Sequence, residues 1–144
     1  MLEVVVMITN ADITIYNKYI DNNTRTVKYK KTYLYGVNWQ EKQAINIGDK
    51  STNKAYSIDI VTVYIPFTVS SLKVYIEPTK YYKLSEEEKN NYFTINNEDI
   101  IARGIIDKDI MKISDLDNGV LIDSIITNDN GSYFMKHWQV GGVY

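Results

Sequence analysis

Polar and apolar side chains alternate along residues 26–35. One parity carries Val27, Tyr29, Tyr33 and Tyr35, and the other carries Thr26, Lys28, Lys30 and Thr32. A period of two predicts a β-strand with one face toward water. Residues 12–20 form a similar run, which ends at the cluster 21–24, where Asp and Asn favour a turn. The two runs therefore predict a β-hairpin.

Later segments continue the β pattern. Residues 57–65 are apolar on nearly both faces and end at Pro66, which predicts a strand in the middle of a sandwich or barrel. Residues 121–127 and 132–140 flank a polar turn and predict a second hairpin. Residues 92–95 and 99–103 predict a further pair of strands. Roughly eight or nine short strands at this spacing are typical of small all-β domains.

Residues 78–91 are the one stretch with helical character. Ser85 and Glu88 have the spacing of a capping box, and Thr79 is suited to cap a turn before them. We therefore expect one or two short helical turns around residues 79–91. The whole pattern predicts a mainly β fold, a small β-barrel or β-sandwich of antiparallel hairpins, with residues 1–144 in a single domain. Residues 1–8 are expected to form an N-terminal strand or arm.

Composition narrows the functional classes. The chain contains no Cys, which excludes disulfides and thiolate metal sites. Its 16 Lys and Arg nearly balance 18 Asp and Glu, so no strong field for nucleic acid is present. The apolar residues 1–8 are far fewer than the ~20 that span a bilayer and lack a basic leader, so we expect a strand and no membrane partner.

Candidate chemistry is sparse along the chain. His137 is the only histidine, and no nucleophile motif such as G-x-S-x-G accompanies it. Residues 115–119 lack the Gly and Glu spacing of a calcium loop, and residues 86–88 read as a solvated helical turn. Gly141 and Gly142 read as a flexible tail near the chain end. We therefore expect no catalytic, cofactor-binding or metal-binding residues and no enzymatic activity.

The abundance of tyrosine is the most informative feature of the composition, with 13 Tyr against 3 Phe. A tyrosine ring can fill a β core with its hydroxyl at the rim, or supply area at a subunit contact, and the sequence leaves both readings open. The basic residues near position 30 read as a solvated strand edge. The candidate subunit-contact residues are Val4, Val5, Val6, Ile8, Tyr81, Tyr82 and Trp138.

The order of several segments resembles small virion proteins from the head–tail junction of tailed phages and prophages. The resemblance rests on residues 12–16 leading into a hairpin, 36–39, 58–66, 99–104 and the ending 125–140. It covers most of the chain, and its motifs are structural. It implies a head-closure or stopper protein with a small β-barrel or sandwich and a long loop, for which residues 47–56 and 80–91 are candidates.

The same resemblance implies partners and a location. Such subunits form a homo-oligomeric ring, often a dodecamer, between the portal–adaptor assembly and the tail, with a lumen for DNA. The protein would assemble in the bacterial cytoplasm and reside in the virion. Two alternatives stay open: a tail-terminator or minor capsid protein within the same class, and a monomeric β-sandwich module that binds carbohydrate or peptide. Formation of a ring would distinguish a virion protein from a monomeric binding module.

Overall fold

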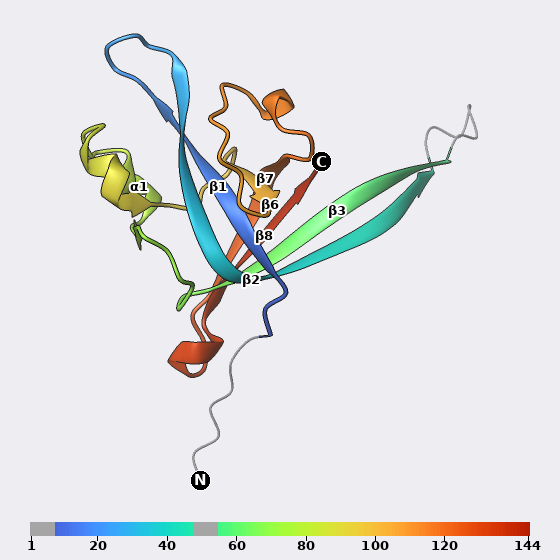
Figure 1. Cartoon of the computed structure of the whole chain (residues 1–144). Coiled ribbons are helices and arrows are strands. Elements are labelled where there is room, and N and C mark those ends of the chain that lie inside the picture. The colour runs from blue at the N-terminus through green and yellow to red at the C-terminus, as the bar shows by residue number, and fades with distance from the viewer. Residues whose placement is uncertain (1–7, 48–54) are drawn as a thin grey trace.

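Six strands close into a barrel in the computed structural model, which describes residues 8–47 and 55–144. Neighbouring strands run antiparallel in the order β1-β2-β3-β8-β7-β6, and β6 pairs back to β1 (Figure 1). The strands are β1 (Ala11–Ile20), β2 (Val27–Ile47), β3 (Ala55–Pro66), β6 (Ile100–Arg103), β7 (Val120–Asn128) and β8 (His137–Val143). The predicted mainly β fold with a small barrel is confirmed.

Short elements connect the barrel strands. They are β4 (Val74–Tyr75), α1 (Pro78–Tyr81), η1 (Glu88–Asn91), β5 (Tyr92–Phe93), η2 (Ile113–Asp115) and η3 (Tyr133–Met135). The predicted helical turns are therefore confirmed, and the backbone N–H of Glu88 donates to Ser85 Oγ at 3.1 Å as half of a capping box. Pro78, rather than a Thr79 cap, begins α1, since proline is pre-organised for the first helical position.

Gly36 lets β2 serve as one 21-residue strand. The register with β1 shifts by one residue at this point, from Asp12↔Tyr35 to Ala11↔Val37, and Gly36 has a φ of +88°. Its N–H donates to Asp12 Oδ1 at 2.9 Å. A bulge of this kind reverses the parity of the strand, so Leu34 before it and Val37 after it both point into the barrel.

Before this bulge, the face of β2 that points into the barrel is not the face that carries the tyrosines. The buried parity of residues 32–35 is that of Thr32 and Leu34, whereas Tyr33 and Tyr35 lie outward. Their rings cover the outside of the wall, where Lys31 contacts the Tyr33 ring at 5.9 Å from Nζ to the centroid. Tyrosine tolerates this position because its ring packs while its hydroxyl finds a polar partner, as Tyr33 OH donates to Asp107 Oδ1 at 3.3 Å.

Both predicted hairpins are present, but the third strand pair is wrong. β1 pairs with β2, and β7 pairs with β8 from Leu121↔Val143 to Asn128↔His137. Residues 92–95 and 99–103 do not pair with each other: β5 pairs in parallel with β4, while β6 lies between β1 and β7. Both edges of β6 are needed to close the barrel, which leaves none for β5.

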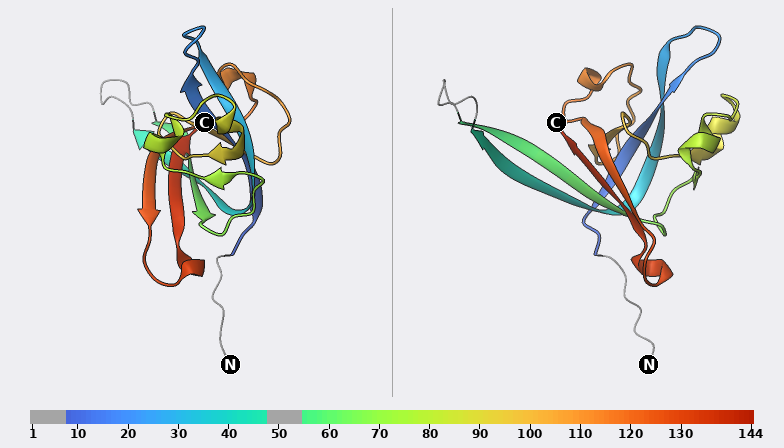
Figure 2. Two further views of the ribbon diagram at one scale, coloured as in Figure 1. Left: turned by 90° about the vertical axis from the view of Figure 1, so that its left-hand side faces the viewer. Right: turned by 180° about the vertical axis from the view of Figure 1, so that it is seen from behind.

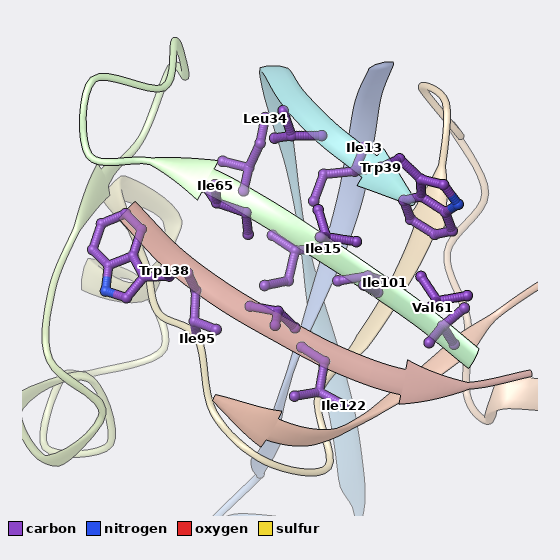
Figure 3. Close-up of a cluster of buried hydrophobic side chains, with 14 of the residues drawn as sticks. Ile13, Ile15, Leu34, Trp39, Val61, Ile65, Ile95, Ile101, Ile122 and Trp138 are labelled. Atoms are coloured by element: carbon purple, nitrogen blue, oxygen red, sulfur yellow. The ribbon is translucent and has the colours of Figure 1, made fainter. Parts of the chain in front are cut away.

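The core fills the barrel with side chains from all six barrel strands and from the segment before β6, as Figure 3 shows. Its labelled members are Ile13, Ile15, Leu34, Trp39, Val61, Ile65, Ile95, Ile101, Ile122 and Trp138. A second cluster on the outer face of β1 and β6 contains Tyr16, Ile100, Ala102, Ile110 and Leu116. β1 is therefore buried on both faces. A barrel interior packed this way is a solid core and offers no channel.

Gly141 and Gly142 lie inside β8, so the predicted flexible tail is wrong. Gly142 is buried where β8 crosses the irregular part of β7, and a Cβ atom there would overlap the carbonyl oxygen of Leu121. A Cβ atom on Gly141 would meet the hydroxyl of Ser124, which can rotate away. Only Gly142 is thus required by close approach of two backbones.

Gly142→Ala should destabilise the barrel far more than Gly141→Ala. The first forces β7 and β8 apart, a backbone change that costs on the order of 3 kcal/mol, and the second displaces one side chain for about 1 kcal/mol or less. Urea unfolding followed by tryptophan fluorescence measures both. Equal loss in the two variants would show that β7 and β8 do not approach closely at Gly142.

Candidate interaction surfaces

An apolar row crosses the outside of three barrel strands. Ile60 of β3 pairs with Val143 of β8, which pairs in turn with Leu121 of β7. Successive residues of these strands are buried inside the barrel, so the three side chains share its outer face. Their exposed fractions are 38% for Ile60, 38% for Val143 and 42% for Leu121. We call these three residues the outer row.

The opposite wall of the barrel is covered. Residues 104–119 pack on the outer face of β1 and β6, where Tyr16 OH donates to the carbonyl of Lys108 at 2.7 Å. Thr14 Oγ1 donates to the carbonyl of Gly104 at 2.8 Å and accepts the N–H of Ile106 at 2.9 Å. Lys31 Nζ lies 3.3 Å from carboxylate oxygens of both Asp107 and Asp109. The fold therefore closes one outer wall with its own chain, while the outer row keeps apolar side chains exposed.

A two-stranded arm projects from the barrel (Figure 2). β1 pairs with β2 only as far as Val37, and β8 pairs with β3 only from Ile60 onward. Residues 43–47 of β2 and 55–59 of β3 therefore pair only with each other among the described residues. We call these residues the arm. Its two strands carry backbone donors and acceptors on their outer edges, which a closed barrel otherwise does not expose.

A cleft of about 430 Å³ lies between the tip of the β1–β2 hairpin and the 78–91 segment. Lys89 lies at its base, and its Nζ is 5.6 Å from the ring centroids of both Tyr19 and Tyr81. The same Nζ donates to the carbonyl of Leu84 at 2.6 Å. Burial lowers the pKa of Lys89, and the nearby Lys30 charge lowers it further. The ammonium is thus held by two π faces and one carbonyl rather than by a carboxylate.

Asp99 joins β1 to the turn before β6 through a buried network. Its Oδ2 accepts from Asn17 Nδ2 at 2.9 Å and from the N–H of Asn96 at 2.9 Å, and its Oδ1 accepts the N–H of Lys18 at 2.9 Å. Asn17 also donates to the carbonyl of Thr94 at 2.6 Å. Burial raises the pKa of Asp99 to about 6, although these hydrogen bonds oppose the rise. The network positions the wall that carries the cleft.

The candidate subunit-contact residues fall into three groups. Val4, Val5 and Val6 lie outside the described residues. Ile8 is 82% exposed, and Tyr82 is exposed at the cleft with its hydroxyl accepting from Asn96 Nδ2 at 3.1 Å.

Tyr81 and Trp138 are buried inside the chain, which corrects their assignment to a surface. The Trp138 ring lies between Phe67 and Tyr75, with centroids 4.3 and 4.4 Å away, and Tyr81 lies under Lys89. Aromatic side chains of this size supply most area when they fill a core, and these two do so.

The polar residues that are candidates for chemistry have structural partners. His137 Nδ1 donates to the carbonyl of Met135 at 2.9 Å, and its ring contacts Tyr64. Asp115 accepts the N–H groups of Met111 and Lys112 and so caps a turn. Among the described residues, no cluster of three or more His, Cys, Asp or Glu could hold a metal ion. Within the same ranges, no helix has the length and apolar character needed to cross a membrane.

The outer row was not anticipated from the sequence, although one signal pointed to it. Residues 57–65 are apolar on nearly both faces, and only one face of a barrel strand points inward. Val61, Val63 and Ile65 take the inner face of β3, which leaves Ile60 outside. The partners Leu121 and Val143 could not be identified without the register of β7 and β8.

Comparisons with known proteins identify one family. A family model described as a family of unknown function (DUF6751) matches residues 8–143, and the chain therefore belongs to this family. The match covers the whole barrel, including the outer row. Neither a curated protein nor a solved structure matches the chain.

The Asp99→Asn substitution should cost more stability at pH 4 than at pH 7. The folded pKa of about 6 lies above the ordinary 3.8, so the stability that protonated Asp99 contributes is present below about pH 4 and lost as pH rises through 6. The two effects should differ by roughly 2 kcal/mol. Urea unfolding across this pH range gives the difference between the two proteins. Asp123→Asn removes an exposed carboxylate and serves as the control; a pH-independent cost at Asp99 would contradict the assignment.

Proposed function

We propose that this member of DUF6751 is a structural subunit that assembles with copies of itself into a ring at the head–tail junction of a tailed phage. The outer row is the observation that carries the proposed assembly, because it leaves three adjacent apolar side chains on an otherwise complete barrel. The place in a phage particle rests on the sequence resemblance. A head-closure role is our first choice, with a tail-terminator or minor capsid role as the alternative within this class.

The fold suits a ring subunit for physical reasons. A ring requires two different surfaces on each copy that meet by a rotation that closes. The barrel supplies a rigid wall with the outer row, and the arm extends away from the barrel (Figure 1). Because side chains fill the barrel, any passage for DNA would lie between copies rather than through one.

A structural role also agrees with the chemistry of the described residues. His137 is engaged with a backbone carbonyl, and the buried Asp99 is engaged by three donors within the fold. A general acid or base needs a proton-transferring group that faces a substrate site. We therefore propose no enzymatic activity, no cofactor and a location in the virion, with the portal–adaptor and tail proteins as partners.

The purified 144-residue chain should form rings. Size-exclusion chromatography with light scattering gives the copy number, and negative-stain electron microscopy gives the symmetry. A twelvefold ring would support a head-closure role, and a sixfold ring would support the terminator alternative. A protein that stays monomeric at every concentration would contradict the assembly.

Leu121→Lys should dissociate the ring, whereas Leu72→Lys should leave it intact. Burying a leucine at an interface contributes about 1.5–3 kcal/mol, and a lysine there adds a desolvation cost, so each contact should weaken at least about tenfold. Leu72 is 97% exposed and lies outside the outer row, so Leu72→Lys makes the same chemical change as Leu121→Lys away from the proposed interface. Equal behaviour of the two variants in light scattering would exclude the outer row from the interface.

The cleft beside Lys89 supports an alternative function, that of a monomeric binding module. Its lining includes Lys18, Tyr19 and Tyr82, a combination that suits an acidic peptide or a carbohydrate. A monomer that binds such ligands, with binding lost in Tyr82→Ala, would favour this module over the ring.

A further inference from the structure

The free backbone edge of β2 is the strongest unassigned feature of the molecule. Beyond Val37, where the pairing with β1 ends, β2 continues for ten residues to Ile47. Its other edge is taken by β3 from Asn38↔Tyr64 to Ile47↔Ala55. Among the described residues, no strand pairs with the first edge from Gln40 onward. An unpaired edge of this length is a template for an added strand.

Asn10 ends the pairing of β1 with this edge. Its backbone N–H donates to the carbonyl of Val37 at 2.9 Å, and its side chain then takes both backbone groups of Trp39. Asn10 Nδ2 donates to the Trp39 carbonyl at 3.1 Å, and Asn10 Oδ1 accepts the Trp39 N–H at 2.8 Å. An amide side chain therefore occupies the position that the next ladder residue would take.

The chain before Asn10 does not continue along the edge. The carbonyl of Ile8 accepts Asn38 Nδ2 at 3.0 Å, which is a side-chain contact and not ladder pairing. Ile8 is 82% exposed. In Figure 1, β1 and the arm diverge at this point. Ile8, the first described residue, thus lies beside Asn38 near the start of the free edge, which the chain before Asn10 does not follow.

The seven residues before Ile8 have the composition of a strand. Five of residues 2–7 are apolar, three of these are valines, and no proline or glycine interrupts them. Their length is close to that of the free edge from Gln40 to Ile47. A segment of apolar β-branched residues is stabilised when its backbone hydrogen-bonds to a sheet edge and its side chains cover an apolar surface.

We infer that residues 2–7 of one copy pair with the free edge of β2 in a neighbouring copy. The occupant is a second copy of this chain, and the inference rests on the proposed ring assembly. Because each copy both gives a strand and receives one, the contact is head-to-tail and closes when the rotation between copies completes a circle. The Asn10 contacts favour the neighbour's edge over the chain's own edge, since the Asn10 side chain occupies the ladder position beside Trp39 of its own chain.

Cysteine cross-linking in the 144-residue chain tests the inference, because its sequence contains no Cys. Three donor chains carry Val4→Cys, Val5→Cys or Val6→Cys, and a receiver chain with a different tag carries Gln43→Cys. Mild oxidation of each mixture should give a disulfide-linked pair that contains both tags. The three donor positions allow for the register, since Cβ atoms must come within about 4.5 Å.

The matched control replaces Gln43→Cys with Leu72→Cys, which offers an exposed thiol away from the edge. The expected result is linkage through Gln43→Cys and none through Leu72→Cys. Linkage within a single chain that carries both Val5→Cys and Gln43→Cys, without linkage between tags, would overturn the inference. Linkage at neither position would also overturn it.

Electron microscopy of the same samples separates this inference from the proposed function. Rings without cross-links through Gln43→Cys would refute strand exchange and leave the assembly in place, whereas the absence of rings would refute the assembly itself. Removing residues 1–7 should abolish rings while thermal unfolding of the barrel stays unchanged. Intact rings from the shortened chain would contradict the inference independently of any disulfide.

Discussion

The fold depends on β2 remaining one continuous strand while its inward face changes parity. A strand that kept its alternation past Tyr35 would point Val37 and Trp39 at water. The extra residue at Gly36, in a conformation with positive φ, prevents this, and the Asp12 carboxylate holds its N–H. Because β2 stays unbroken, it completes the barrel with β1 at one end and builds the arm with β3 at the other.

The two outer walls of the barrel differ in how they are finished. The wall of β1 and β6 is closed by residues 104–119, which bring a second apolar cluster and satisfy the hydroxyls of Thr14 and Tyr16. The wall of β3, β8 and β7 keeps the outer row exposed. Sixteen residues of the chain cover one wall, whereas apolar side chains stay exposed on the other. Such an exposed apolar surface is suited to contact with another protein chain. This asymmetry supports our proposed assembly.

Tyrosine side chains lie both in the core and on the outside of the barrel. Tyr16, Tyr19 and Tyr81 are buried, and the hydroxyls of Tyr16 and Tyr19 find a carbonyl and the Glu86 carboxylate. Tyr33 and Tyr35 lie on the outside of β2 instead. The same side chain meets both demands because a large ring and a polar tip can each be placed where it is stabilised. Composition alone could not assign individual tyrosines to one environment or the other.

The sequence by itself determined the β class, the two hairpins and the helical turns near residues 78–91. These are local properties, fixed by alternation, turn residues and spacing within a few positions. Only the tertiary structure decided which strands close the barrel. It also decided that residues 92–95 and 99–103 pair with different strands, and that Gly142 lies inside β8. The outer row and the free edge of β2 were decided there too. They arise from contacts between strands far apart in the chain, and register over such distances is set by packing of the whole barrel rather than by any local run of residues.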